Sequence, residues 1–339
     1  MSSSLALNLS GFLGCAVTIF FAGKKLSWYG DLLAEKTGWG KAWVGLILMA
    51  SVTSLPELTV GISSSAIIQS ADLAVGNVLG SCAFNLGILA LMDAFVPKHR
   101  HIFAVASTSH VMAAALGIIL LALVGFGLFL NEKVVLISWI GLTSVIFIII
   151  YFISIRLMFL HEKRYLMRAE VMTYYPAAEK KQLSFRLIVS RFIVYAVIIV
   201  LSGLALPYFA EHIAEQTGMK TSFVGTLFLA GSTSLPEIAV SLAAVRMGGI
   251  DLSVGNLLGS NIFNIFTLAI NDIFYTKGHI LKHADQSNLV SVFSAILMSA
   301  IVIIGLTYRT EGKRYKLAWD AALIFLVYII NMILLYNLS

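Results

Sequence analysis

The sequence predicts an all-α membrane protein of ten transmembrane helices in two inverted five-helix repeats. Hydrophobic residues make up 59% of the 339 residues, and charged residues make up only 12%, roughly half the charged share of a soluble domain. Ten segments are long and apolar enough to cross a bilayer. Two polar motifs of the first half return in the second half, which indicates an internal repeat.

The ten spans are predicted where about 20 consecutive residues are predominantly apolar. The mean hydropathy of the chain, +0.92, agrees with this many spans. In chain order the predicted spans are Leu5–Gly23, Ala42–Ile68, Leu73–Phe95, Phe103–Leu130, Val134–Ile155, Phe192–Ala210, Ser222–Val245, Leu252–Tyr275, Leu289–Leu306 and Leu317–Leu338.

Lys and Arg predict the orientation, because cytoplasmic loops carry the excess of these residues. With the central polar segment in the cytoplasm, 19 of the 23 Lys and Arg lie inside and 4 lie outside. This bias predicts both termini outside, in a plasma membrane of the prokaryotic inner-membrane type. The chain divides into a first repeat (1–156), a basic cytoplasmic linker (157–190) and a second repeat (191–339). Basic residues flank apolar spans, so the pI near 9.2 indicates membrane lipid and no nucleic-acid partner.

The internal repeat is clearest in its polar residues. At an offset of 180, residues 53–57 (TSLPE) recur as residues 233–237, and residues 75–85 align with residues 254–264 at an offset of 179. Because each half has five spans, an odd number, the second half enters the membrane from the opposite side. Inverted repeats characterise secondary transporters, whose substrate site lies near the midplane.

The repeated motif combines a helix break with a carboxylate. Pro56 and Pro236 have no backbone N–H, so each leaves a carbonyl four residues earlier without its helical partner. Glu57 and Glu237 lie near the middle of their spans, where a charge costs about 2.5–3.5 kcal/mol. No Lys or Arg lies deep in a span. We therefore expect a bound cation to compensate both glutamates and the free carbonyls.

The following span of each repeat supplies neutral oxygen donors. Ser81 and Asn85 are four residues apart and share a helix face, and Ser260 and Asn264 repeat this spacing. Such donors suit Ca²⁺ or Na⁺ better than zinc or copper.

Other polar residues in and around the spans are expected to have mainly structural roles. Asn77 and Asn256 fit a structural role and a binding role equally well. His110 has no evident counterpart and is expected to be packed and neutral. Capping or solvated roles are expected for four aspartates at span ends, namely Asp72, Asp93, Asp251 and Asp272.

These motifs resemble the two alpha-repeats of the sodium/calcium exchanger family, within the calcium/cation antiporter superfamily. The resemblance covers nearly the whole chain. The first copy reads SVTSLPE (51–57) with GNVLGSCAFN (76–85), and the second reads GSTSLPE (231–237) with GNLLGSNIFN (255–264).

The resemblance implies a ten-helix fold with four clustered cation sites. Calcium would be held by the carboxylates of Glu57 and Glu237 and by the carbonyls of Thr53 and Thr233. Asn85 and Asn264 would lie in the middle, and spans one and six would slide to alternate access. Two flanking sodium sites would be formed by Ala50, Ser54, Glu57 and Ser81, and by Ala230, Ser234, Glu237 and Ser260.

Three positions depart from the family pattern. Asn264 stands where many relatives have Asp, Cys82 stands where the pattern has Asn, and Ser51 stands where it has Gly. Asn264 removes one ionisable group, so a role that needs a charge or a proton there is lost. Both three-for-one and electroneutral two-for-one exchange remain open.

The expected function is secondary active antiport of Na⁺ for Ca²⁺ by alternating access. An H⁺-coupled divalent cation antiporter of the same superfamily is the alternative, with H⁺ or Mn²⁺ as further ions. A cation channel fits less well, because broken helices in an inverted repeat are typical of alternating access. An enzyme is not expected, because there is no Gly-x-Ser-x-Gly motif, no catalytic His pair and no metal triad. A monomer without a resident cofactor is expected; Ca²⁺ and Na⁺ are cargo.

Overall fold

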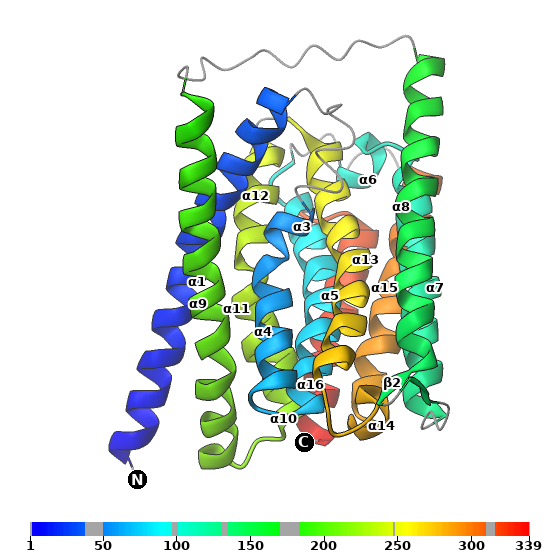
Figure 1. The fold of residues 1–339 in the computed structure, drawn as a ribbon. Helices are drawn as coiled ribbons and strands as arrows, with labels where there is room; N and C mark the ends of the chain where they lie inside the picture. Colours follow the sequence, from blue (N-terminus) through cyan, green and yellow to red (C-terminus); the bar gives the residue numbers. More distant parts are fainter. Residues whose placement is uncertain are drawn as a thin grey trace.

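Long helices run between two opposite ends of the molecule (Figure 1). The computed structural model describes residues 2–37, 50–96, 101–130, 135–137, 139–169, 183–246, 248–309 and 316–338. The elements of the first repeat are α1 (Ser2–Thr37), α3 (Ala50–Thr53), α4 (Leu55–Ala66), α5 (Ala71–Asp93), α6 (Ile102–Val105), α7 (His110–Phe129), β1 (Val135–Ile137), β2 (Ile140–Gly141) and α8 (Leu142–Ala169).

The second repeat follows the same order of long and short helices. Its elements are α9 (Phe185–Thr217), α10 (Thr221–Val224), the π-helix η2 (Gly225–Leu229), α11 (Ala230–Thr233), α12 (Leu235–Arg246), α13 (Ile250–Phe274), α14 (Ile280–His283), α15 (Asn288–Tyr308) and α16 (Trp319–Leu338).

The helices account for the predicted spans. In the described part of the chain, eight helices are long and apolar enough to cross a membrane, and the bent pair formed by residues 221–233 and 235–246 makes nine. The remaining predicted span, Ala42–Ile68, begins outside the described residues and continues as α3 and α4. The ten-helix prediction is consistent with this count.

Several predicted boundaries were wrong. Helix α1 continues to Thr37 and α9 begins at Phe185, because helical hydrogen bonding continues through polar residues that hydropathy excludes. The helix predicted from Val134 starts only at Leu142. Two short antiparallel strands precede it and pair Val135 with Gly141 and Ile137 with Ile140.

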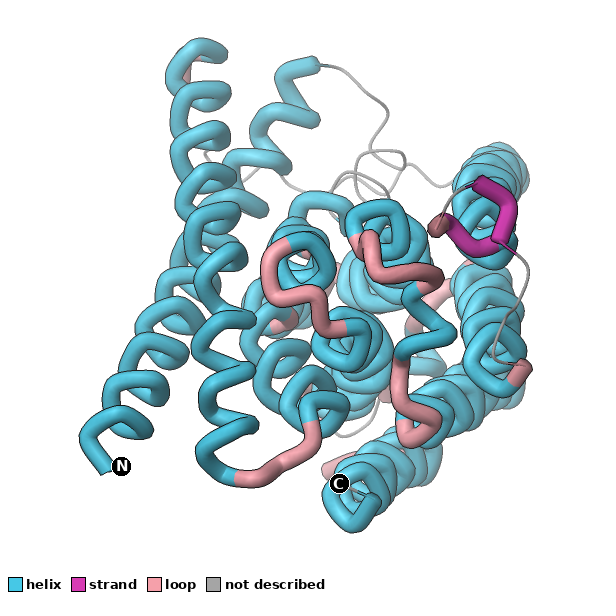
Figure 2. Tube along the Cα trace, turned by 60° about the horizontal axis from the view of Figure 1, so that its bottom comes forward, coloured by secondary structure: helices cyan, strands magenta, loops and turns pink. Residues whose placement is uncertain are grey.

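The helices divide into a central group and an outlying pair. Helices α1 and α9 lie side by side at one edge of the bundle (Figures 1 and 2). In their most apolar stretches only 28% of α1 and 17% of α9 residues are buried, compared with 89% of α5 and 78% of α13. The helices α5 and α13 therefore form the core around which the other helices pack.

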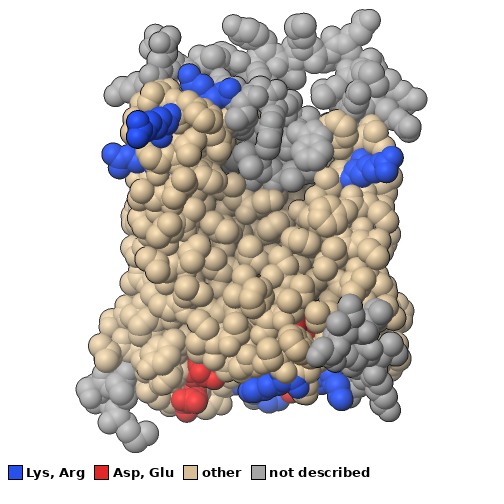
Figure 3. Space-filling view, in the orientation of Figure 1, with Lys and Arg blue, Asp and Glu red and all other residues tan. Residues whose placement is uncertain are grey.

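The chain passes from one repeat to the other at one end of the molecule. Both termini lie together at one end, which we call the terminal end (Ser2 and Leu338), whereas α8 ends and α9 begins at the opposite end, which we call the linker end (Ala169 and Phe185) (Figure 1). Between the ends, the face seen in Figure 3 shows a broad band without charged side chains, as a membrane-spanning surface requires.

Aspartates at both ends of α5 and α13 accept hydrogen bonds from backbone N–H groups of neighbouring segments, so the expected capping role is confirmed. Asp93 accepts the backbone N–H of Ile102 (2.9 Å) and of Ala318 (2.8 Å), and Asp272 accepts those of Ile280 (2.7 Å) and Gly141 (2.9 Å). Each aspartate thus binds the next short helix of its own repeat. It also binds the start of the last helix of the other repeat.

The first-turn aspartates of α5 and α13 form a second matched pair of contacts. Asp72 accepts the backbone N–H of Asp285, and Asp251 accepts that of Ser107, both at 2.6 Å. The Nε2 atom of His110 lies 3.1 Å from Asp251. Asn288 occupies the equivalent position in the second repeat, and its Nδ2 atom donates to Asp72 at 3.5 Å. His110 therefore has a counterpart, Asn288, and the expectation that it has none was wrong.

Candidate cation-binding site

The two TSLPE motifs break their helices in the same way. Ser54 connects α3 to α4 with φ −88° and ψ 12°, and Ser234 connects α11 to α12 with φ −84° and ψ 8°. The backbone N–H of each serine donates to the alanine four residues earlier, Ala50 or Ala230, at 3.0 Å. The second break bends the span by 45°. Both breaks place a glutamate in the first turn of the following helix.

The two glutamates are bound crosswise between the repeats. The side chains of Glu57 and Glu237 are completely buried. The Ser234 hydroxyl donates to Oε1 of Glu57 at 2.9 Å, and the Ser54 hydroxyl donates to Oε1 of Glu237 at 3.2 Å. Each break therefore supplies both a carboxylate and the donor that holds the carboxylate of the other repeat.

Each glutamate keeps one oxygen without a hydrogen-bond donor. These atoms are Oε2 of Glu57 and Oε2 of Glu237, and among the described residues no Lys or Arg pairs with either carboxylate. Buried polar atoms are normally satisfied, so two such oxygens need an explanation. A cation bound between them would satisfy both.

Three of the four predicted neutral donors of α5 and α13 show the same deficit. In the described structure the Ser81 hydroxyl, Oδ1 of Asn85 and both amide atoms of Asn264 are buried without a hydrogen-bond partner. The Ser260 hydroxyl lies 3.4 Å from the Thr53 hydroxyl.

All twelve predicted site residues are buried. They lie on α3, α4, α5, α11, α12 and α13, or at the two breaks. The structure thus gathers oxygen atoms from both repeats into the interior of the bundle.

Asn77 and Asn256 contact the threonines of the opposite repeat. The Thr233 hydroxyl donates to Oδ1 of Asn77 at 3.3 Å, and the Thr53 hydroxyl donates to Oδ1 of Asn256 at 3.4 Å. Asn77 also donates to the backbone carbonyl of Glu57 at 3.3 Å. The repeated Gly-Asn dipeptide carried the signal for these contacts, but spacing alone did not indicate their partners.

Glycines of α5 allow the opposite repeat to approach the site. A Cβ atom at Gly80 would lie 2.6 Å from the backbone of Thr226 and 2.8 Å from Cβ of Ala230. A Cβ atom at Gly76 would lie 2.8 Å from the carbonyl oxygen of Ser222. Both close approaches are made to the span that carries the second helix break.

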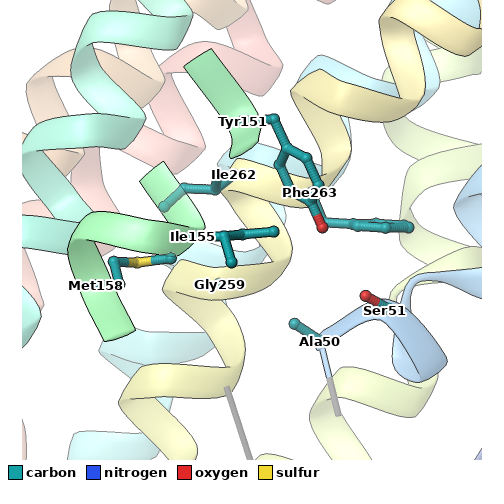
Figure 4. A pocket seen from close by; sticks show the side chains of 8 residues that line it. All are labelled: Ala50, Ser51, Tyr151, Ile155, Met158, Gly259, Ile262 and Phe263. Carbon is teal, nitrogen blue, oxygen red and sulfur yellow. The ribbon is translucent and has the colours of Figure 1, made fainter. Parts of the chain in front are cut away.

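A narrow crevice lies beside the site between α3, α8 and α13 (Figure 4). Its lining includes Ala50 and Gly259, the residue directly before Ser260. The hydroxyls of Tyr151 and Ser51 face each other across it. Its remaining lining residues are Ile155, Met158, Ile262 and Phe263.

The donor set differs from that of a zinc or copper centre. Within the described ranges, no group of three or more His, Cys, Asp or Glu side chains could hold a metal ion. Two carboxylates surrounded by hydroxyl, amide and carbonyl oxygens are the donors that hard cations prefer.

An inverted repeat with two broken helices and buried carboxylates defines the class of secondary cation transporters. The chain matches the sodium/calcium exchanger protein family over residues 7–160 and 187–337. It belongs to this family, and as a member it is an antiporter that exchanges Na⁺ for Ca²⁺ across a membrane.

Individual relatives agree with the family assignment. The chain is 32% identical over 133 residues to the sodium/calcium exchanger MaX1 of Methanosarcina acetivorans, which covers 38% of this chain and 36% of MaX1. It is 27% identical over 320 residues to the inner membrane protein YrbG of Escherichia coli, and this match covers 92% of this chain and 91% of YrbG.

A solved structure shares the fold. The sodium-calcium exchanger NCX_Mj, in crystals soaked with Na⁺ and Sr²⁺, superimposes with a TM-score of 0.62 at 21% identity, over 97% of this chain and 98% of that one.

Proposed function

We propose that this protein exchanges Na⁺ for Ca²⁺ at one centre formed by both repeats, in a plasma membrane with both termini outside. The observation that carries the proposal is the pair of buried carboxylates, each with one oxygen that lacks a donor. Uncompensated charge at this depth is costly, and a transported cation removes the cost.

The proposed calcium ligands are the unpaired oxygens of Glu57 and Glu237 together with the carbonyl oxygens of Thr53 and Thr233. Pro56 and Pro236 support this assignment, because each removes a helical N–H near these carbonyls. Asn85 and Asn264 complete the centre. The flanking sodium sites are proposed from Ala50, Ser54 and Ser81 beside Glu57, and from Ala230, Ser234 and Ser260 beside Glu237.

The charge count makes calcium and sodium occupancy mutually exclusive. Two carboxylates balance one Ca²⁺, and Asn264 adds no charge. One Ca²⁺ together with two Na⁺ ions in the flanking sites would leave two net positive charges in the buried centre, so entry of sodium into the flanking sites displaces calcium.

The outlying pair α1 and α9 is proposed to move against the remaining helices. Gly23 of α1 lies against the Pro236 ring, and Gly203 of α9 lies against the side chain of Thr59. The pair therefore touches both helices that carry the glutamates. Two of its close contacts there involve glycines, which let helices approach closely.

The test is calcium-45 uptake into proteoliposomes that contain the purified protein. Uptake is expected only when sodium inside exceeds sodium outside, and Glu57→Gln is expected to abolish it. Clamping the membrane potential with valinomycin and potassium separates three-for-one exchange, which responds to potential, from electroneutral exchange. Uptake driven by a pH gradient without sodium would overturn the proposal in favour of proton coupling. Flux without any counter-ion would indicate a channel.

A further inference from the structure

Asn261 lies where α5 and α13 cross, beside the proposed centre. Its Nδ2 atom donates to the backbone carbonyl of Cys82 at 3.2 Å, and its Oδ1 atom accepts from Nδ2 of Asn85 at 3.1 Å. All three side chains are buried. Asn261 therefore connects the backbone of one central helix to a proposed cation ligand of the same helix.

The chemistry of these partners fixes the direction of both amides. A backbone carbonyl can only accept, so the amino group of Asn261 must face Cys82. The remaining Oδ1 of Asn261 can also only accept, so the amino group of Asn85 must face it. Oδ1 of Asn85 is consequently turned away from Asn261, and in the described structure it is buried without a donor.

The second repeat lacks this connection. Cys82 occupies the position equivalent to Asn261, and its thiol lies 3.7 Å from the Asn261 carbonyl, a weak contact. Asn264, the equivalent of Asn85, contacts the Cys82 thiol, which is a weak hydrogen-bond partner. Neither Oδ1 nor Nδ2 of Asn264 has another hydrogen-bond partner among the described residues.

We propose that Asn261 is a positioning residue that presents the amide oxygen of Asn85 to the transported cation, whereas Cys82 offers the amide of Asn264 only a weak thiol contact. This inference rests on the proposed function. One central ligand is preset as an oxygen donor, and no strong hydrogen bond sets the direction of the other. Presetting a ligand raises affinity because the cost of ordering it is avoided.

The first test is a double-mutant cycle on calcium binding, measured by titration calorimetry with the full-length protein. Asn261→Leu keeps nearly the size of the side chain and removes both hydrogen bonds. It is expected to weaken Ca²⁺ binding about tenfold in the wild-type background. In the Asn85→Ala background the same change is expected to alter binding by less than about twofold, because no amide remains to be positioned. Thermal denaturation of each variant checks folding.

The second test adds the missing connection. Cys82→Asn places an amide oxygen beside Asn264 and is expected to tighten Ca²⁺ binding about threefold. Cys82→Leu, the matched control, fills a similar volume without an acceptor and is expected to give no gain. In the Asn264→Ala background, the gain from Cys82→Asn is expected to disappear.

The outcomes separate this inference from the proposed function. If wild-type protein binds Ca²⁺ and Glu57→Gln does not, but Asn261→Leu costs equal amounts with and without Asn85, the positioning role is overturned and the exchange function stands. An equal effect of Cys82→Asn and Cys82→Leu overturns the inference in the same way. Wild-type protein that binds neither Ca²⁺ nor Na⁺ overturns both.

Discussion

The first repeat and the second repeat place nearly the same groups at the proposed centre but differ in some outer turns of their helices. Around the centre, Glu57 and Glu237 are equally buried, and the serine at each break donates to the glutamate of the other repeat. Away from the centre, some positions that are polar in one repeat are apolar in the other.

One such difference lies between the last turns of α4 and α12 and between the facing turns of α13 and α5. Toward the terminal end, Ser64, Ser65 and Asn271 have buried polar atoms without hydrogen-bond partners in the described part. Toward the linker end, the equivalent positions carry Ala244, Val245 and Met92. Pseudo-symmetry is therefore closer around the two glutamates than at these outer positions.

This comparison indicates which contacts the proposed cation would require. An ion bound between two repeats would contact an equivalent carboxylate from each repeat, so the glutamates and their serine donors are expected to match. The outer turns of the helices would not contact the ion, so they carry no such requirement. The predictions below test this division.

The largest effect is expected at the carboxylates. Glu57→Gln and Glu237→Gln each keep the side-chain shape and remove one charge of the buried centre. Each is expected to weaken Ca²⁺ binding about a hundredfold or more, and the two losses are expected to agree within about threefold. Calorimetry on the purified variants measures both. A wild-type Ca²⁺ affinity in either variant would show that the two glutamates do not contribute equally to the proposed centre.

The crosswise serines are expected to matter next. Ser234→Ala and Ser54→Ala each remove a hydroxyl donor to a carboxylate, an interaction worth about 1.5–3 kcal/mol. We expect roughly tenfold weaker Ca²⁺ binding for each, with the larger loss for Ser234→Ala because its bond is shorter, 2.9 Å against 3.2 Å. Ser10→Ala, on the exposed part of α1, is the control. A larger loss for Ser54→Ala than for Ser234→Ala would contradict the order expected from the two hydrogen-bond lengths.

The glycines of the outlying pair are expected to affect transport rate more than binding. Gly23→Ala brings a Cβ against the Pro236 ring, and Gly203→Ala brings one within 2.9 Å of Cβ of Thr59, which side-chain rotation does not move. Overpacking of this kind costs about 1–3 kcal/mol. We expect about tenfold slower uptake for each variant, with Ca²⁺ affinity nearly unchanged. Gly14→Ala, which meets no neighbouring atom within 4 Å, is the control. A parallel loss of affinity would argue against a role in movement.

The smallest effect is expected from making the repeats more alike at the linker end. His110→Asn reproduces the residue found at the equivalent position, Asn288. The Asp251 side chain that pairs with His110 is 54% exposed, and such pairs contribute about 0–1 kcal/mol. We expect a change in unfolding free energy below about 0.5 kcal/mol and unchanged exchange, measured by thermal denaturation and calcium uptake. A large loss of stability or of calcium uptake would show that His110 has a role beyond its hydrogen bond to Asp251.

Much of the site could be predicted from the sequence. The repeated TSLPE motif and the i, i+4 spacing of serine and asparagine identified ten residues, and the family resemblance added Ala50 and Ala230; the structure buries all of them in the bundle. Local rules sufficed here because proline breaks a helix wherever it occurs, and because four residues separate neighbours on one helix face.

Contacts between the repeats could not be predicted in the same way. The sequence did not indicate that Ser54 holds Glu237 instead of the adjacent Glu57, or that Asp93 binds the N–H of Ala318. These bonds join residues separated by about half the chain or more, so they depend on how the two halves pack. Helix ends such as Thr37 and Leu142 were also missed, because they depend on neighbouring helices and loops.

By itself, the sequence determined the membrane setting, the inverted duplication and the residues at the two breaks. Apolar length, proline and buried charge act locally, and they act alike in each copy. Only the tertiary structure decided how the copies meet: which oxygens remain unpaired, which serine faces which glutamate, and that Asn261 orients Asn85. Those outcomes depend on the distance and direction between side chains of different helices, which the packing of α5 against α13 sets.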